Sequence, residues 1–129
     1  MSFIPGMTGK AETTVVHENT AAAVGSGLVP VFSTPMMIAL MENAAVNALS
    51  PAMEEGLGTV GTRLEVSHDA ATPIGMKVWA DATLTAVEGK KFTFSITAFD
   101  EAGPIGTATH ERFLITVDRF LAKAEAKRK

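Results

Sequence analysis

The sequence predicts an α+β domain in which a mostly antiparallel sheet wraps around one long central helix. The first observation is the stretch TPMMIALMENAAVNAL, residues 34–49, which is almost entirely apolar and carries a single charge. The second is that four segments with a two-residue apolar alternation follow this stretch at the spacing of hairpins. Antiparallel strands of this kind bury one shared face, and a single buried helix is the element available to cover that face.

The chain has 129 residues, of which 47% are hydrophobic. This length and composition indicate a single domain over residues 1–129 with enough apolar surface for its own core. We expect residues 1–10 to form an N-terminal extension and residues 118–129 to form a C-terminal helix or tail.

Charge and composition exclude several classes of function. The formal net charge is −3, which gives no general reason to expect nucleic-acid binding. The chain has no cysteine, so disulfides, thiolate metal sites and a cysteine nucleophile are excluded. The N-terminus lacks the apolar run of a signal peptide, and the longest apolar run, PMMIALM, is too short to span a bilayer. We therefore expect a soluble, cytoplasmic protein without a membrane or nucleic-acid partner.

The elements are expected in the following order. Residues 11–18 alternate weakly and predict a first strand. Residues 21–32, AAAVGSGLVPVF, predict a loop or short helical turns. Ser33 or Thr34 can cap the central helix, with Pro35 as its first residue, and Pro51 ends the helix. The apolar residues cover nearly the whole circumference of this helix, which is typical of a buried helix.

Everything after the helix alternates like strand. The predicted strands are residues 61–69, 76–87, 92–98 and 106–117. In the first of them, Leu64, Val66 and His68 share a face that packs toward the helix. Turns are expected at Glu88-Gly89 and at residues 101–104.

Two polar residues stand out because they point into this apolar interface. Glu42 lies in the middle of the buried helix, where a carboxylate is costly to bury unless it is paired or used in chemistry. His68 ends the apolar face of a strand. If the two meet between helix and sheet, they form a proton-transfer pair. The alternatives are a carboxylate at the helix edge that pairs with Arg63 or Arg112, and a histidine satisfied within the core.

A third candidate is Thr34, whose hydroxyl lies at the helix start close to free backbone N–H groups that favour a developing oxyanion. Its structural alternative is the helix cap. His110, Glu111 and Arg112 form a polar cluster in the last strand, with His110 and Arg112 on one face. We interpret this cluster as a solvated strand end. We expect no metal site, because the chain has no paired-histidine metal spacing.

The segments VFSTPMMIALMENAA, GTRLEVSHDAATPIGMKVWADATLTAVEGKKFTF and GTATHERFLI resemble the fluoroacetyl-CoA thioesterase family of the hotdog superfamily. The resemblance runs from about Val31 to Arg119. It implies a hotdog fold, acyl-CoA thioester hydrolysis and a homodimer, with a further pairing of dimers left open. Coenzyme A is then part of the substrate, and no separate cofactor is implied.

The resemblance also assigns site residues. The family's catalytic threonine, glutamate and histidine fall on Thr34, Glu42 and His68. A glycine that begins the histidine's strand matches Gly61, and the arginine of the HER segment matches Arg112, both as substrate-binding residues.

One segment departs from the family. The fluoroacetate-specific enzyme carries aromatic residues ahead of the helix, whereas GSGLVPVF has none before Phe32. The acyl group therefore stays open, and the glutamate can act as nucleophile or as general base. An enoyl-CoA hydratase or dehydratase and a non-catalytic acyl-CoA binding module are the alternative functions.

Overall fold

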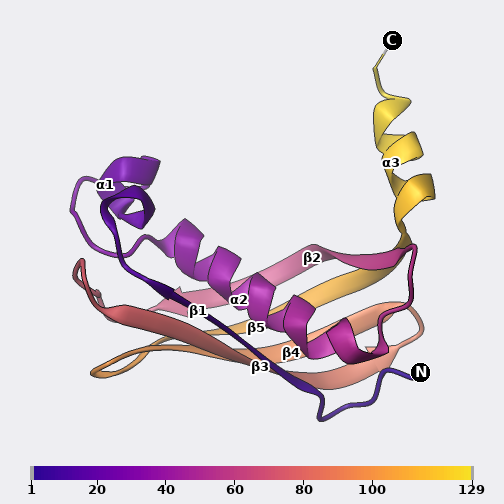
Figure 1. Ribbon diagram of the computed structural model, residues 1–129, viewed down its shortest axis with the longest axis horizontal. Helices are drawn as coiled ribbons and strands as arrows, with labels where there is room; N and C mark the ends of the chain where they lie inside the picture. The colour runs from indigo at the N-terminus through magenta and orange to yellow at the C-terminus, as the bar shows by residue number, and fades with distance from the viewer. Residues whose placement is uncertain (1, 129) are drawn as a thin grey trace.

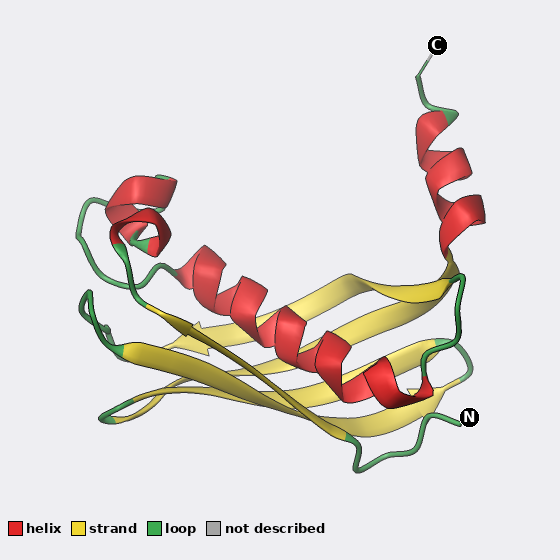
Figure 2. Ribbon diagram, in the orientation of Figure 1, coloured by secondary structure: helices red, strands yellow, loops and turns green. Residues whose placement is uncertain are grey.

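A computed structural model describes residues 2–128. Within this range, a five-stranded antiparallel sheet curls around one long helix (Figure 1; Figure 2), which confirms the predicted fold class. The strands are β1 (Thr8–Thr14), β2 (Leu57–His68), β3 (Lys77–Glu88), β4 (Lys91–Asp100) and β5 (Gly103–Thr116). The helices are α1 (Ala21–Val24), α2 (Thr34–Leu49) and α3 (Val117–Glu125), with 3₁₀ turns at His17–Asn19 and Ser50–Ala52. None of the helices in the described range is long and apolar enough to cross a membrane.

The strand order is β1-β3-β4-β5-β2. Strands β3, β4 and β5 follow one another as hairpins. The expectation of hairpin spacing is wrong for β2, because it does not pair with β3 and instead pairs antiparallel with β5 at the far edge. This pairing sets Gly61 opposite Arg112 and His68 opposite Gly106. Residues that are about 50 and 40 positions apart along the chain are therefore neighbours on the sheet, and β2 forms one of its edges.

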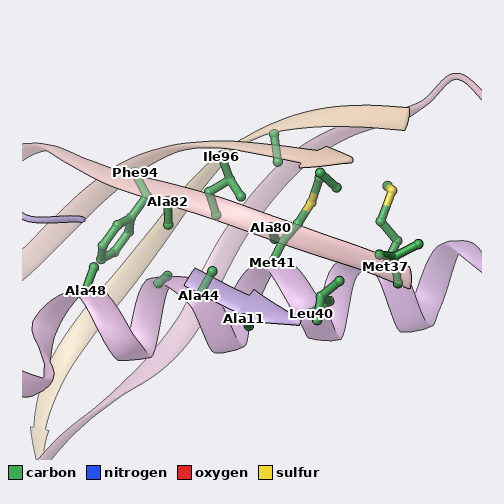
Figure 3. Close-up of a cluster of buried hydrophobic side chains, with 14 of the residues drawn as sticks. Ala11, Met37, Leu40, Met41, Ala44, Ala48, Ala80, Ala82, Phe94 and Ile96 are labelled. Atoms are coloured by element: carbon green, nitrogen blue, oxygen red, sulfur yellow. The ribbon is translucent and has the colours of Figure 1, made fainter. Parts of the chain in front are cut away.

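Helix α2 lies across the concave face of the sheet, and the core forms between them. Figure 3 shows its inward side chains meeting those of the strands. The helix contributes Met37, Leu40, Met41, Ala44 and Ala48, and the sheet contributes Ala11, Ala80, Ala82, Phe94 and Ile96, all of them buried. The two-residue alternation predicted for β3 and β4 is confirmed, because Val78, Ala80, Ala82 and Leu84 face the helix together with Phe92, Phe94, Ile96 and Ala98.

The contact between β1 and α2 depends on Gly9. A β-carbon at Gly9 would lie 2.2 Å from the backbone N of Ala48 and 2.3 Å from the backbone O of Ala44. Only glycine allows the strand to approach the helix backbone so closely. Because glycine is unfavourable in strands, the sequence pattern does not indicate that the strand includes this position. The predicted range 11–18 is therefore wrong at its start.

The end of β1 is also earlier than predicted. Asn19 accepts a hydrogen bond from the backbone N–H of Val16 and donates one to the carbonyl of Thr14. These bonds turn the chain after Thr14, before the apolar pair Val15-Val16 that made the strand seem longer. Strand β2 begins at Leu57 and not at residue 61, because Gly58 and Gly61 interrupt its alternation and its register shifts between Gly61 and Arg63.

The apolar circumference of α2 is not covered on every side. The described chain buries one side of the helix, but Met36 is 37% exposed and Val46 is 43% exposed. The expectation of a fully buried helix is therefore wrong for a single chain. Val46 lies toward the edge strand β2, at a groove that Met53 and Leu57 also line, whereas Met36 lies on the β1 side of the helix.

Candidate active site

The start of α2 brings a hydroxyl against an imidazole. Oγ1 of Thr34 lies 2.7 Å from Nδ1 of His68, within hydrogen-bond distance. Thr34 is the first residue of α2 and His68 is the last residue of β2. The strand end and the helix start are thus held together by this contact.

Thr34 is free for this contact because its neighbour caps the helix. The hydroxyl of Ser33 accepts a hydrogen bond from the backbone N–H of Met36 at 3.3 Å, as expected of an N-cap. Pro35 occupies the second helical position, where its missing N–H costs nothing. Of the two hydroxyls that the sequence offered as caps, Ser33 is therefore the cap.

His68 has one ring nitrogen engaged and one free. Its Nε2 is buried and has no hydrogen-bond partner among the described residues. Burial lowers the pKa of His68 below its usual value of about 6.5, while the Ala70 backbone and the Asp69 carboxylate oppose this effect. A neutral imidazole with an uncommitted nitrogen suits a group that takes up or gives a proton.

Thr34 and His68 line a pocket of about 280 Å³. Its walls come from the loop ahead of α2 and from the segment after β2, and they include Ser26, Gly27, Val29, Phe32, Ala70 and Ala71. The pocket therefore opens at the N-terminus of α2, where the helix dipole favours negative charge.

A second polar cluster lies further along α2, around Glu42. Its Oε2 accepts a hydrogen bond from Nη1 of Arg112 at 3.1 Å, so Arg112 is the partner and not Arg63. The guanidinium is held in turn by Thr59, whose hydroxyl accepts from Nε at 2.9 Å and whose carbonyl accepts from Nη2 at 3.0 Å. Arg63 instead pairs with Glu65 on the exposed face of β2.

His110 completes this cluster. Its Nδ1 lies 2.8 Å from the Arg63 carbonyl oxygen, which can only accept, so Nδ1 carries the proton. Its Nε2 then accepts from Nη1 of Arg112 at 3.2 Å and lies 3.9 Å from Oε2 of Glu42. Burial is the main cause that lowers the pKa of His110, which keeps the ring neutral and this arrangement intact.

Gly61 lies directly against the Glu42 carboxylate. A β-carbon at this position would lie 2.7 Å from Oε2 of Glu42, 3.1 Å from Cε1 of His110 and 3.3 Å from Nη1 of Arg112. The absence of a side chain at Gly61 is therefore what gives the carboxylate its place.

The predicted residues fall into two groups within one chain. Thr34 and His68 are in contact, and Glu42, Gly61 and Arg112 are in contact, but the structure does not bring Glu42 next to His68. Eight residues separate Thr34 from Glu42, which is about 12 Å along a helix. The imidazole beside Glu42 is His110.

Sequence reasoning missed His110 and Thr59. The interpretation of residues 110–112 as a solvated strand end is wrong, since His110 is 2% exposed and Arg112 is 6% exposed. The available signal was their shared face, which the alternation placed on the helix side. Among the described residues, no group of three or more His, Cys, Asp or Glu side chains could hold a metal ion.

Comparison with known proteins shows the family to which the chain belongs. Residues 15–118 match the family described as fluoroacetyl-CoA-specific thioesterase. The fluoroacetyl-CoA thioesterase of Streptantibioticus cattleyicolor is 43% identical over 97 residues, which cover 75% of this chain and 70% of that protein.

Solved structures match this chain over all or nearly all of its length. A structure of the fluoroacetyl-CoA thioesterase FlK is 33% identical, covers 100% of both chains and has a TM-score of 0.93. A hot-dog-like protein from Thermanaerovibrio acidaminovorans is 27% identical, covers 98% of this chain and 94% of its own, and has a TM-score of 0.87. The chain therefore has the hotdog fold and belongs to the family of fluoroacetyl-CoA-specific thioesterases.

Proposed function

We propose that this protein hydrolyses acyl-CoA thioesters at the pocket formed by Thr34 and His68. The observation that carries the proposal is the hydroxyl–imidazole pair, which sits at a helix N-terminus with one imidazole nitrogen uncommitted. A thioester carbonyl placed there would direct its oxygen toward the N-terminus of α2, where the helix dipole favours negative charge. The family of the chain supports the same class of reaction.

The reaction needs a carboxylate as well as an imidazole. In the proposal, Glu42 either attacks the carbonyl carbon to form an anhydride, which water then opens, or removes a proton from the attacking water. In both routes the C–S bond breaks, the thiolate takes up a proton and leaves as free CoA, and the acyl group leaves as a carboxylic acid. His68 carries the proton, and Thr34 holds the reacting groups.

A homodimer would bring the two polar groups together, and we include it in the proposal. Strand β2 is an edge of the sheet, with Gly61 beside Glu42 and His68 beside Thr34. A two-fold axis midway between Gly61 and His68 would pair β2 with its copy in antiparallel fashion. Each Thr34–His68 pair would then face Glu42 of the partner. The exposed Val46 on α2, which lines a groove with Leu57 of β2, supports a covered interface on this side.

The acyl group and the setting of the reaction also belong to the proposal. The relatives are named for fluoroacetyl-CoA, but the segment ahead of Phe32 lacks aromatic residues in this chain. We expect a small or medium acyl group and a cytoplasmic location, where CoA thioesters are made and consumed.

The direct test is release of free thiol from a panel of acyl-CoAs, from acetyl and fluoroacetyl to branched, aromatic and long-chain esters. The chain has no cysteine, so the protein adds no thiol of its own. We expect rapid release with one acyl class, lost in Glu42→Gln and kept in the exposed control Glu54→Gln. Binding of acyl-CoA without release, or loss of enoyl-CoA absorbance without release, would reject hydrolysis.

The shared site has its own test, because Glu42→Gln and His68→Ala chains can be mixed. If each site takes Glu42 from one chain and His68 from the other, a mixed dimer contains one intact site. Random exchange of subunits then restores about one quarter of the wild-type rate. If both residues act within one chain, every site stays defective and the mixture remains inactive.

A further inference from the structure

Helix α3 carries an apolar stripe that its own chain does not bury. Val117, Phe120, Leu121 and Ala124 recur at the spacing of one helix face. Phe120 is 41% exposed, Leu121 is 57% exposed, and no residue of α3 is buried. We call these four residues the α3 stripe. A stripe of this kind is stable on a soluble domain when another surface covers it.

Helix α3 projects away from the sheet of its own chain. The helix follows β5 directly and rises beside the start of β2, where the backbone N–H of Val117 donates to the carbonyl of Gly56 at 3.0 Å. Figure 1 shows α3 standing clear of the sheet at the opposite end of α2 from α1. Phe120 shares a hollow with Phe113 and Ile115 of its own β5, and the exposed rest of the stripe is free to meet a surface from beyond the β2 edge.

A second exposed apolar surface lies at the other end of α2. The loop of residues 25–30, called here the lid loop, follows α1 and includes Leu28 at 96% and Val29 at 56% exposure. Ser26, Gly27 and Val29 line the pocket that contains Thr34 and His68. The lid loop therefore forms part of the wall of the pocket, and its own outer side is uncovered.

The two-fold pairing of β2 relates these two surfaces. The α3 stripe lies beside Leu57, the first residue of β2, and the lid loop lies beside His68, its last residue. With the two-fold axis midway between Gly61 and His68, Leu57 of one protomer lies level with Thr72 of the other, whose carbonyl accepts from the backbone N–H of Phe32 just after the lid loop. Each protomer would thus bring its α3 stripe to the lid loop of its partner, and one contact would cover both apolar surfaces.

We infer that α3 of one protomer packs its stripe on the lid loop of a second copy of this chain and so forms the outer wall of that copy's substrate pocket. The inference rests on the β2-paired dimer proposed above. It makes the C-terminal helix part of the acyl-CoA site of the partner, although the helix contacts no pocket residue of its own chain. Substrate affinity then depends on a segment about 85 residues away from Thr34 along the chain.

The test uses the fact that the chain has no cysteine. The variant Leu28→Cys/Leu121→Cys is prepared as the full-length protein, oxidised mildly and run on a non-reducing gel. The inference predicts a disulfide between chains, which requires Cα atoms within about 7 Å. A disulfide within one chain is excluded, because α2 has 16 residues and separates the two positions by about 24 Å.

The controls distinguish the contact between α3 and the lid loop from dimer formation in general. Leu28→Cys/Ile4→Cys places its second cysteine at an equally exposed apolar residue outside the α3 stripe, since Ile4 is 61% exposed. It should give no linked chains, and neither should either single variant. Light scattering on the same samples measures the oligomeric state. A dimer without the specific link overturns the position of α3 and leaves the thioesterase proposal standing, whereas a monomer overturns the dimer as well.

A kinetic measurement tests the role in the pocket. Leu121→Glu should raise the KM for acyl-CoA about tenfold while kcat stays near wild type, because the lid loop loses its cover but the reacting groups do not move. Leu121→Met keeps the apolar contact and should behave like wild type. An unchanged KM in Leu121→Glu would overturn the inference, and so would binding of α3 to anionic lipid vesicles in place of the disulfide.

Discussion

Gly61 and Glu42 are so close that a β-carbon on the glycine would lie 2.7 Å from Oε2 of the carboxylate. Real β-carbons do not approach an oxygen to this distance, so any side chain at position 61 must move the carboxylate. The movement is possible because Glu42 is flexible and its side chain is 40% exposed. The position of a proposed catalytic group thus depends on the absence of atoms on the neighbouring strand.

We therefore expect Gly61→Ala to lower kcat by about 100-fold, the range typical of a misplaced acid–base group, with little change in melting temperature. Thiol-release kinetics and thermal unfolding measure the two effects. Gly58→Ala is the matched control on the same strand, since its β-carbon would meet only Val117 Cγ2, at an ordinary 3.4 Å. Equal rates for the two variants would contradict the role of Glu42.

Ser33 and Thr34 should separate stability from rate. Ser33→Ala removes the cap of α2 and should cost about 1 kcal/mol of unfolding free energy, while most of the rate is kept. Thr34→Val keeps the shape of the side chain but loses the hydroxyl at His68, and its rate should fall on the order of 100-fold with little loss of stability. Denaturant unfolding measures the stability of both variants, and thiol-release kinetics measure their kcat. A normal rate in Thr34→Val would remove Thr34 from the site.

The rate should depend on pH through His68. Burial lowers the pKa of His68, so the neutral ring is present at neutral pH and is lost only at acid pH. We expect kcat/KM to rise with pH through an inflection below about 6.5 and to be level near pH 7. Asp69 raises the pKa of His68, so Asp69→Asn should move the inflection to lower pH. An inflection that does not move in this variant would assign the titration to another group.

The stability should depend on pH through His110. Its folded pKa is lowered mainly by burial and also by Arg112, while the Arg63 backbone, Glu42 and Glu111 act in the opposite direction. The unfolded chain then binds the proton more readily, so the stabilisation is complete above about pH 6.5 and is lost as the pH falls toward the folded pKa.

We therefore expect the melting temperature to fall below about pH 6.5, and less steeply in His110→Gln than in wild type. The glutamine can still donate to the Arg63 carbonyl and accept from Arg112, but it does not titrate. His17 is exposed on its 3₁₀ turn, and His17→Gln is the control that should follow wild type. Parallel slopes for His110→Gln and wild type would contradict this assignment.

The fold could be predicted because its signals are local. The apolar run of α2 and the alternation of β3 and β4 each state which side chains are buried. The position of β2 at the far edge of the sheet could not be predicted. The sequence between β2 and β3 does not show whether these two strands pair with each other or with other strands. The start of β1 could not be predicted, because it contains Gly9. A glycine is required there by the close approach of the α2 backbone, which the sequence does not show.

The site was only partly readable for the same reason. Glu42 and His68 stood out as polar residues in apolar surroundings, and Thr34 as a hydroxyl at a helix start. Which of them touch depends on the register of β2 against β5 and on the bulge near Gly61, neither of which leaves a local pattern. The alternation put His110 and Arg112 on one face, but only the pairing with β2 shows that this face meets Glu42.

The close contact between Gly9 and the backbone of α2 limits which substitutions the protein can accept. The contacts there are made by backbone atoms of Ala44 and Ala48, so no side chain can rotate to admit another carbon. In a saturation library selected for folded protein, we expect substitutions at Gly9 to disappear almost completely. The outward threonines of β4 and β5, such as Thr97 and Thr107, should accept many residues. The least tolerant position would then lie in the first ten residues of the chain, far from any group that takes part in the reaction.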